Sequence, residues 1–256
     1  MTALVTGASG GIGLELARVM ARDGWDLVLA SRDGAALARV AGELAAAHGI
    51  SALPVAVDLA DPGGPDALRR VVAEKRVRVD ALVNNAGFGA HGPFALDDPA
   101  VSAAMVGLNV ASLMRLTRLF IGDMLERRSG RILNVSSIAG FVPGPHMAVY
   151  HATKAFVTSF SEALAEELRG TGVTVTALCP GPVRTGFAAR AGTKEMPAQR
   201  FMQVTATACV RAGYRGMMKG KRMVIPGLAN RFLIAASRLL PRRIVAHAVG
   251  IMQKGR

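Results

Sequence analysis

A tyrosine and a lysine four residues apart are the side chains in this sequence best suited to acid–base chemistry. Tyr150 and Lys154 lie in an amphipathic stretch, residues 149–169, that predicts a helix, and residues four apart share one face of a helix. A free phenol has a pKa of about 10, too high for proton transfer at neutral pH. A nearby ammonium favours the phenolate and lowers that pKa. The pair therefore indicates a proton donor to a carbonyl, or an acceptor from an alcohol.

A glycine-rich turn near the start of the chain is suited to holding phosphate. The stretch Thr6-Gly7-Ala8-Ser9-Gly10-Gly11-Ile12-Gly13 separates the apolar run 2–6 from a helical pattern over 12–22. Glycines allow a tight turn and close backbone approach, and a helix N-terminus offers free N–H groups and a positive dipole end. A purely structural turn is the alternative. The strand–turn–helix context favours a dinucleotide site, with contacts from Gly7, Ser9, Gly11, Ile12 and Gly13.

The end of the second predicted strand bears on which dinucleotide is bound. An acidic residue there binds ribose hydroxyls and repels a 2′-phosphate. This chain has Ser31 in place of the acid, followed by Arg32, whose guanidinium can grip a phosphate through two hydrogen bonds. We therefore predict NADP(H), with NAD as the less favoured cofactor. The alternative is that Arg32 is only a solvated loop charge.

The elements that must position these residues alternate between apolar runs and helical patterns. We expect strands at 2–6, 27–30, 52–57, 81–84, 131–136 and 173–178, with a seventh at 223–225. Wholly apolar strands separated by helices predict a parallel sheet covered on both faces. The expected fold is α/β: a single doubly wound Rossmann domain of about seven strands over residues 1–256, with a C-terminal helical extension.

The glycine spacing resembles that of the short-chain dehydrogenase/reductase family, in its Tyr-x-x-x-Lys branch. The family pattern is Thr-Gly-x-x-x-Gly-x-Gly, and the resemblance extends over roughly residues 2–185. It implies hydride transfer between a nicotinamide cofactor and a carbonyl or alcohol. Tyr150 would transfer the proton, while Lys154 would lower its pKa and hold the ribose.

Two further positions complete the family's catalytic set. Ser137 lies thirteen residues before Tyr150, the family's usual separation, and would donate a hydrogen bond to the substrate oxygen. Ser136 is the competing assignment. Asn109 matches the fourth position, whose main-chain carbonyl holds a water connected to the lysine in relatives.

The resemblance also implies contacts to the cofactor beyond the glycine turn. Asp58 would contact adenine, with a plain helix cap as the alternative. The Asn84-Asn85-Ala86-Gly87 motif would stabilise the sheet and line the cofactor, and the turn after the sixth strand would orient the nicotinamide carboxamide. The remaining assigned contacts are Leu59, Asn85, Ala86, Gly87, Pro180, Gly181, Val183 and Thr185.

The later part of the chain is expected to form the substrate pocket. Residues 1–185 are predicted as the cofactor-binding and catalytic core, 186–220 as a substrate lid and 228–256 as a basic helical tail. The predicted apolar walls suggest a lipophilic or acyl substrate, although such residues also serve ordinary packing: Phe88, Phe94, Phe141, Val142 and Phe187. No histidine forms a ligand-spaced pair with a carboxylate, so no metal site is predicted. His146 is expected to border the pocket.

Charge and cysteine usage limit the partners and the compartment. The formal net charge is +13, and residues 196–256 contain twelve Lys or Arg and no Asp or Glu. The tail, split by Pro241, is compatible with a packed helix with a basic face, peripheral membrane attachment, or docking of an acidic partner. The absence of a nucleic-acid motif argues against nucleic-acid binding. Cys179 and Cys209 do not suggest a disulfide framework, which favours a reducing compartment.

Taken together, these features predict an NADP(H)-dependent oxidoreductase acting on a small lipophilic or acyl molecule. The alternative is a dinucleotide-binding scaffold or sensor with little turnover. No leader precedes the first motif and no apolar run reaches the roughly 18 residues of a membrane span, so a cytoplasmic, possibly membrane-peripheral, protein is expected. We expect a homodimer or homotetramer formed through residues 101–128 and 149–169.

Overall fold

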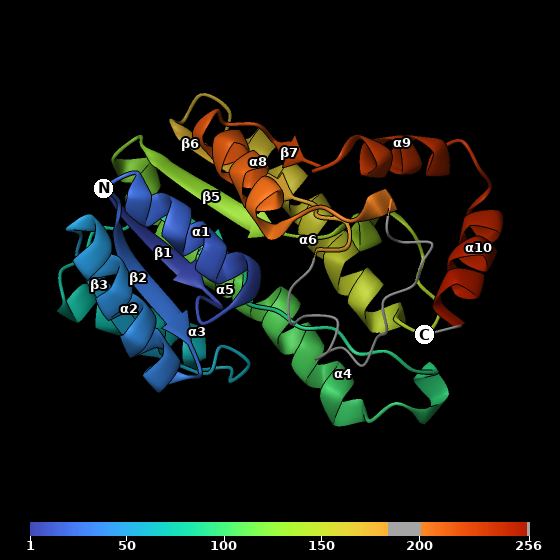
Figure 1. Ribbon diagram of the computed structural model, residues 1–256, viewed down its shortest axis with the longest axis horizontal. Helices are drawn as coiled ribbons and strands as arrows, with labels where there is room; N and C mark the ends of the chain where they lie inside the picture. Colours follow the sequence, from blue (N-terminus) through green and yellow to red (C-terminus); the bar gives the residue numbers. More distant parts are fainter. Residues whose placement is uncertain (184–200, 255–256) are drawn as a thin grey trace.

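Seven parallel strands form one twisted sheet at the centre of the molecule (Figure 1). The computed structural model describes residues 1–183 and 201–254. The strand order is β3-β2-β1-β4-β5-β6-β7, so the direction of winding reverses between β1 and β4. In open α/β sheets, ligands bind beyond the carboxyl ends of the strands at such a reversal. The strands are β1 (Thr2–Thr6), β2 (Asp26–Ser31), β3 (Ala52–Ala56), β4 (Ala81–Asn84), β5 (Gly130–Val135), β6 (Val173–Leu178) and β7 (Met223–Val224).

Helices cover both faces of the sheet and bury two apolar layers. The first layer lies under α1 (Gly11–Arg22), α2 (Gly34–His48) and α8 (Ala206–Met218). The second lies under α3 (Gly64–Glu74), α5 (Leu113–Glu126) and α6 (Ala148–Glu167). Successive strand residues point to opposite faces, so Val5 joins the first layer and Leu4 the second. Because both faces are covered, the strands carry continuous apolar runs, and the predicted doubly wound fold is confirmed.

One helix is long and apolar enough to span a membrane, although the sequence predicted no segment of that kind. Residues Pro99–Glu126 form a continuous helix of α4 (Pro99–Val106), a π-helical segment η2 (Gly107–Ser112) and α5. By length and composition alone it could cross a membrane, with a mean hydropathy of 1.4, whereas no such run was expected. The core helix of a water-exposed domain passes the same test. Here Leu116, Phe120 and Met124 of this helix pack into the second apolar layer.

The chain after β6 returns to the sheet and then leaves it. Val183 pairs with Val204 in an isolated parallel bridge, after which α8 buries Val210 and Met217 in the first apolar layer. This part of the predicted lid therefore belongs to the core, since its apolar face is needed to cover the sheet. Residues 184–200 lie outside the described part of the chain, as do the assigned Thr185 and Phe187.

The predicted tail consists of two helices that extend beyond the sheet. They are α9 (Leu228–Ser237) and α10 (Arg242–Lys254), separated near Pro241 as expected. Both lie on the side of the molecule next to α6, away from β3 (Figure 1). The tail thus stands at the same end of the sheet as the helix that carries Tyr150 and Lys154.

Candidate active site

The glycine turn forms a tight connection whose geometry excludes side chains at two points. Gly7 has a φ of +64°, and its N–H donates to the carbonyl of Ala30 at 2.8 Å. A Cβ on Gly13 would lie 2.4 Å from the Gly7 carbonyl oxygen and 2.4 Å from Nδ2 of Asn85. Gly13 does not line the cavity described below. The absence of a side chain lets α1 approach the turn, and the cofactor contact of Gly13 stays a prediction.

The N-terminus of α1 is open to a ligand. Gly10 is the N-cap, and it has no side chain to accept from the first N–H groups of the helix. Gly10, Gly11 and Ile12 line a cavity at this point. Free N–H groups and the positive end of the helix dipole favour a phosphate here. This arrangement fits the pyrophosphate of a dinucleotide.

The end of β2 supplies the groups expected to recognise a 2′-phosphate. Ser31 and Arg32 line the same cavity, and Ser31 Oγ is buried without a hydrogen-bond partner among the described residues. An unpartnered buried hydroxyl points to a ligand that would satisfy it. Sequence reasoning missed Asp33, which also lines the cavity; its Oδ1 accepts from the N–H of Ala36 at 2.9 Å. This carboxylate is therefore the N-cap of α2.

The stretch after β4 connects the glycine turn to the catalytic helix. Asn85 Nδ2 donates to the Thr6 carbonyl at 2.9 Å, which ties the two strand ends together. A Cβ on Gly87 would lie 2.8 Å from Asn109 Oδ1 and 3.6 Å from Lys154 Nζ. Glycine at this position therefore allows the backbone to pass directly beside two predicted catalytic residues. Asp58 also lines the cavity, and its Oδ1 accepts from the N–H of Ala60 at 2.9 Å in a local turn; the next helix, α3, has Gly63 as its N-cap, so the helix-cap alternative is wrong.

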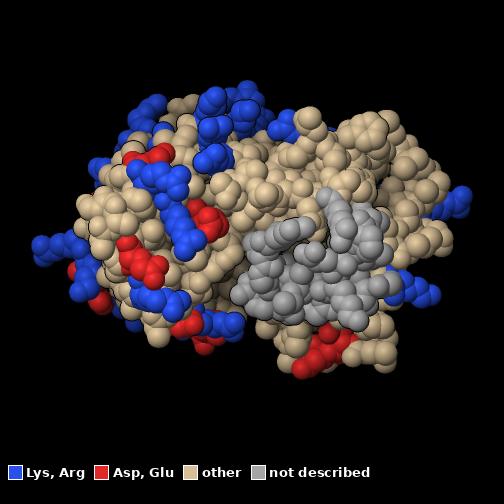
Figure 2. Space-filling view, viewed as in Figure 1, with Lys and Arg blue, Asp and Glu red and all other residues tan. Residues whose placement is uncertain are grey.

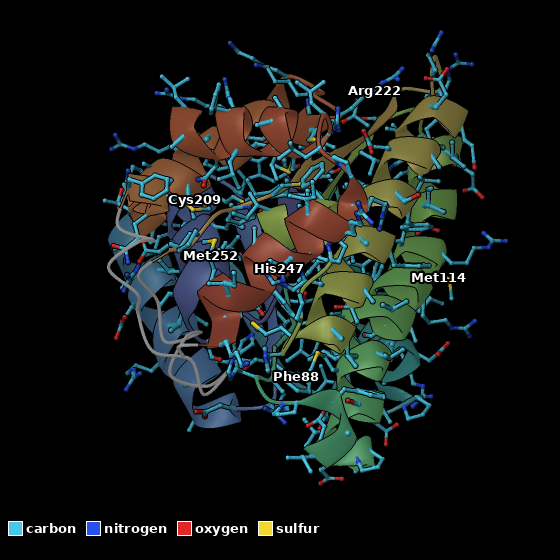
Figure 3. The ribbon with its side chains drawn as sticks, turned by 90° about the vertical axis from the view of Figure 1, so that its right-hand side faces the viewer. Phe88, Met114, Cys209, Arg222, His247 and Met252 are labelled. Carbon is cyan, nitrogen blue, oxygen red and sulfur yellow. The ribbon has the colours of Figure 1, made fainter. Side chains whose placement is uncertain are left out.

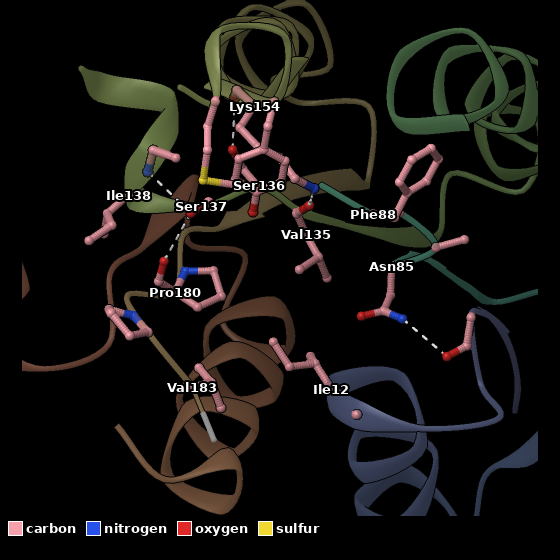
Figure 4. A pocket seen from close by; sticks show the side chains of 18 of the residues that line it. Ile12, Asn85, Phe88, Val135, Ser136, Ser137, Ile138, Lys154, Pro180 and Val183 are labelled. Atoms are coloured by element: carbon pink, nitrogen blue, oxygen red, sulfur yellow. Dashed lines mark hydrogen bonds between the residues drawn. The ribbon is translucent and has the colours of Figure 1, made fainter. Parts of the chain in front are cut away.

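Tyr150, Lys154 and Ser137 line the same cavity at the carboxyl end of β5. Figure 4 shows Lys154 and Ser137 there. Tyr150 and Lys154 are buried on the inner face of α6, and Lys154 Nζ lies 5.9 Å from the centre of the Tyr150 ring. Lys154 Nζ donates to the carbonyl of Val135 at 2.8 Å. Ser137 begins the short helix η3 (Ile138–Phe141) and forms a side-chain hydrogen bond with Tyr150. The sequence spacing thus brings all three groups to one point.

The geometry separates the two competing serines. Ser136 is buried, and its Oγ donates to the Lys154 carbonyl at 2.9 Å and contacts Thr158 Oγ1 at 2.7 Å. Its hydroxyl is thus used to hold β5 against α6. Ser137 Oγ accepts from the N–H of Ala139 at 3.1 Å and contacts Tyr150, which favours the assignment of Ser137.

The charges at this point are set by burial. Burial raises the pKa of Tyr150 to about 12, although its hydrogen bond with Ser137 acts in the opposite direction. Burial lowers the pKa of Lys154 to about 8. The sequence predicted that the ammonium lowers the pKa of the phenol. In this structure burial of the phenol dominates instead, and the ammonium of Lys154 donates to the Val135 carbonyl.

Asn109 lies behind the cavity rather than on its wall. It is buried in the π-helical segment η2; its Nδ2 donates to the Phe88 carbonyl at 2.9 Å and to Thr153 Oγ1 at 3.1 Å. Its Oδ1 accepts from the N–H of Phe88 at 3.1 Å. The side chain therefore holds the stretch after β4 against α6. A π-helical segment such as η2 is rare, and such segments are frequent at functional sites.

A cavity of about 800 Å³ joins the glycine turn to Tyr150. Along its wall, Ile12 and Val183 lie at the end opposite Lys154 (Figure 4). All predicted site residues that the structure describes line this cavity, except Gly13 and Asn109. Those that do are Gly7, Ser9, Gly11, Ile12, Ser31, Arg32, Asp58, Leu59, Asn85, Ala86, Gly87, Ser137, Tyr150, Lys154, Pro180, Gly181 and Val183.

The structure corrects several predicted pocket walls. Phe88 and Val142 line the cavity, but Phe94 is 68% exposed and Phe141 lies outside the lining, with Arg238 over its ring. His146 borders a separate small hollow instead. No group of three or more potential metal ligands is found in the described part of the chain.

Sequence reasoning missed the contribution of the tail to this cavity. Leu233 and Ile234 of α9 and Val249, Met252 and Gln253 of α10 line it. Figure 3 shows α10 across the front of the molecule, with His247 and Met252 along it. Residues of the tail and residues of the glycine turn therefore line one and the same cavity.

Gln253 fastens the tail to the catalytic helix. The Gln253 side chain is buried, and its Nε2 lies 3.1 Å from Nε2 of His151, the residue after Tyr150. His151 Nδ1 lies 2.8 Å from the Val142 carbonyl and must donate to it, which leaves Nε2 to accept from the Gln253 amide. His91 Nε2 donates to the Gln253 carbonyl at 3.0 Å. Only the regular apolar spacing of residues 229–252 could have suggested that this helix packs against the site.

Comparison with known proteins identifies the family. The chain matches the family model described as short chain dehydrogenase over residues 1–196. The chain belongs to the short-chain dehydrogenase family, as the fold and the clustered serine, tyrosine and lysine also indicate. The helices α9 and α10 lie beyond the matched residues.

Individual relatives agree with this assignment. The chain is 36% identical over 187 residues to the ketoacyl reductase HetN of Nostoc sp., covering 73% of this chain and 65% of that protein. A short-chain dehydrogenase from Sphingobium yanoikuyae in complex with NADPH superimposes with a TM-score of 0.84 at 33% identity, covering 93% of each chain. A 3-ketoacyl-(acyl-carrier-protein) reductase from Brucella melitensis complexed with NADH gives a TM-score of 0.79 at 31% identity, covering 89% of this chain and 96% of that one.

Proposed function

We propose that this protein is an NADP(H)-dependent oxidoreductase that interconverts a carbonyl and an alcohol on a lipophilic, acyl-type molecule. The observation that carries the proposal is the single cavity shared by the open N-terminus of α1 and the group of Ser137, Tyr150 and Lys154. When bound, the cofactor supplies or accepts the hydride. The protein supplies proton transfer, orientation and exclusion of water.

The acid–base part of the reaction belongs to Tyr150. In the reducing direction its Oη–H donates a proton to the substrate carbonyl oxygen, and in the oxidising direction the phenolate accepts one. Ser137 Oγ donates a hydrogen bond to the same oxygen and holds it within reach. Lys154 holds its ammonium 5.9 Å from the centre of the Tyr150 ring, where its charge opposes the effect of burial on the pKa of that phenol, and it would bind the ribose hydroxyls. The main-chain carbonyl of Asn109 would hold the water that connects Lys154 to solvent, a role that the family resemblance implies.

The preference for NADP(H) over NAD(H) rests on Ser31 and Arg32. Ser31 Oγ needs a partner, and Arg32 stands beside it without a salt bridge to any described residue. A 2′-phosphate would satisfy both groups. Relatives with NADPH and with NADH are both known, so the residues at β2 are what favour NADP(H) in this chain.

The acyl-type substrate is supported by the shape of the cavity and by a relative. Its lining includes the apolar side chains of Phe88, Val142, Leu233, Val249 and Met252. HetN is named as a ketoacyl reductase. An apolar wall of this kind binds a hydrocarbon chain and leaves the reacting oxygen to Ser137 and Tyr150.

Replacing Tyr150 tests the enzyme assignment. Reduction of a panel of 3-oxoacyl esters and bulky ketones is measured with NADPH and with NADH. We expect Tyr150→Phe to lower kcat/KM about 10²- to 10⁴-fold while NADPH binding, followed by fluorescence, is kept. Retained turnover in this variant would refute the role of Tyr150. NADPH binding by the wild type without turnover on any carbonyl would favour the alternative of a dinucleotide-binding scaffold or sensor.

We also propose that the chain forms a homodimer or homotetramer through α5 and α6. Met114 and Leu125 on α5 and Phe156 on α6 are exposed apolar side chains, and Phe156 stacks on Phe160 at 5.7 Å. Multi-angle light scattering of Phe156→Arg against the wild type tests this interface. A cytoplasmic location stays a prediction.

A further inference from the structure

The outer side of the two tail helices carries an unusual number of exposed apolar side chains. Six of the fourteen large apolar side chains exposed in the described residues lie between 228 and 251, with exposures from 48% to 87%. They are Leu228, Phe232, Leu239, Leu240, Ile244 and Ile251. Scattered exposed apolar residues need no explanation, whereas a contiguous group marks an interaction surface.

Helical spacing separates this outer side from the side that faces the cavity. On α9, Leu228, Phe232 and Ala235 recur at four- and three-residue intervals and are exposed, while Ile234 is buried and lines the cavity. On α10, Ile244, Ala248 and Ile251 repeat the same spacing and are exposed.

The inner side of α10 is buried in turn. Val245 and Gln253 are buried, and Val249 and Met252 line the cavity. Each helix therefore has one face on the cavity and another apolar face on the outside.

The charges beside this surface are all positive. Arg231, Arg238, Arg242, Arg243 and Lys254 are exposed, and none forms a salt bridge with a described residue. The sequence contains no acidic residue from 196 to 256. On the face drawn in Figure 2, the region over α9 and α10 shows no acidic side chain and a few basic ones at its edge.

This combination of charge and apolar area selects the occupant. A second copy placed on the same surface would bring cations against cations, which disfavours a contact between copies. An anionic bilayer offers phosphates to the arginines and hydrocarbon to the leucine, isoleucine and phenylalanine side chains. Apolar residues with flanking Arg and Lys are the pattern of helices that lie in a membrane interface.

We infer that α9 and α10 dock on an anionic phospholipid surface and bring the catalytic cavity to the membrane. Because the inner faces of the same helices line the cavity, a lipophilic substrate in the bilayer reaches Tyr150 along α9 and α10. This second step rests on the proposed function. The docking itself depends only on the outer surface.

Vesicle sedimentation tests the docking without any turnover. The full-length protein is mixed with phosphatidylcholine vesicles that contain either no phosphatidylglycerol or about one third of it. We expect at least tenfold stronger binding to the anionic vesicles, weakened by salt. Phe232→Ser/Leu239→Ser/Leu240→Ser should lower binding at least tenfold, and Arg242→Gln/Arg243→Gln about 10- to 30-fold. None of these side chains lines the cavity.

The matched control places the same change at a different exposed site. Leu96→Ser removes a side chain that is 83% exposed on η1 (Phe94–Leu96) and should leave vesicle binding unchanged. Circular dichroism and NADPH binding should be unchanged in every variant. Equal loss in Leu96→Ser, or no binding of the wild type to anionic vesicles, would overturn the proposal. So would self-association through this surface, seen by light scattering, or binding to soluble polyglutamate in place of vesicles.

The assays also distinguish failure of docking from failure of the proposed function. Reduction of a water-soluble carbonyl should be the same in the wild type and the triple serine variant, whereas reduction of a vesicle-borne 3-oxoacyl lipid should fall with vesicle binding. Vesicle binding without any reductase activity would retain the docking surface and refute the proposed function. Reductase activity without vesicle binding would do the reverse.

Discussion

Lys154 should make the stability of this protein rise with pH relative to a variant that lacks the amine. Burial lowers the pKa of Lys154 to about 8, while the same group in the unfolded chain titrates near 10.4, an approximate reference value. Between these two values the unfolded chain binds more protons than the folded protein. Stability therefore increases with pH across that window, and the destabilisation is greatest below about pH 8.

The size of the effect follows from the two pKa values. From about pH 7 to about pH 10, the free energy of unfolding of the wild type should gain about 2.5 kcal/mol relative to Lys154→Met. Methionine has a similar length and no charge. The buried Cys209 and Tyr214 also have pKa values raised to about 12, but Lys154 is not among the causes, so their contributions cancel in the difference.

Urea unfolding provides the assay. Trp25 is the only tryptophan and is buried, so its fluorescence reports loss of the core. Wild type and Lys154→Met are compared at four pH values between about 7 and 10. The quantity compared is the free energy of unfolding of the wild type minus that of Lys154→Met. If this difference stays constant or falls as pH rises, burial does not lower the pKa of Lys154, and the reasoning is refuted.

Three further substitutions test other parts of the site. Arg32→Ala should raise KM for NADPH about 10- to 150-fold and leave KM for NADH nearly unchanged. Replacement of the exposed Arg39 by Ala is the control and should change neither value. Equal effects of Arg32→Ala on both cofactors would exclude a contact between Arg32 and the 2′-phosphate. Gly13→Ala should cost about 1–3 kcal/mol in urea unfolding, because its Cβ would meet the Gly7 carbonyl, whereas Gly42→Ala, which has open space, should stabilise by about 0.5–1 kcal/mol. Gln253→Ala should raise KM for a lipophilic carbonyl several-fold without changing KM for NADPH; parallel increases in both would contradict a role confined to the substrate wall.

Local residue patterns were sufficient to predict the sheet and most of the cavity lining that is assigned to the cofactor. The glycine turn, Ser31 and Asn85 directly follow predicted strands, and the carboxyl ends of parallel strands must meet at one edge. Tyr150 and Lys154 share a face because they are one helical turn apart. For these residues, position along the chain determines position in space.

The substrate half of the site depends on contacts between distant residues, which periodicity does not reveal. Gln253 meets His151 across 102 residues, and the spacing of α10 is equally consistent with a free amphipathic helix. Phe94 and Phe141 are aromatic residues near the site in sequence, but packing leaves the first exposed and covers the second with Arg238. The motif assigns Gly13 to the cofactor, but it does not reveal the packing requirement that the structure shows, the 2.4 Å approach of the Gly7 carbonyl to a Cβ at this position.

The bridge between Val183 and Val204 joins the wall of the cavity, which Val183 lines, to the segment that leads into α8. Because Val210 and Met217 of α8 lie in the first apolar layer, a ligand held against Val183 is coupled to the packing of that helix on the sheet. Binding to the folded protein alone would then stabilise the whole sheet by mass action.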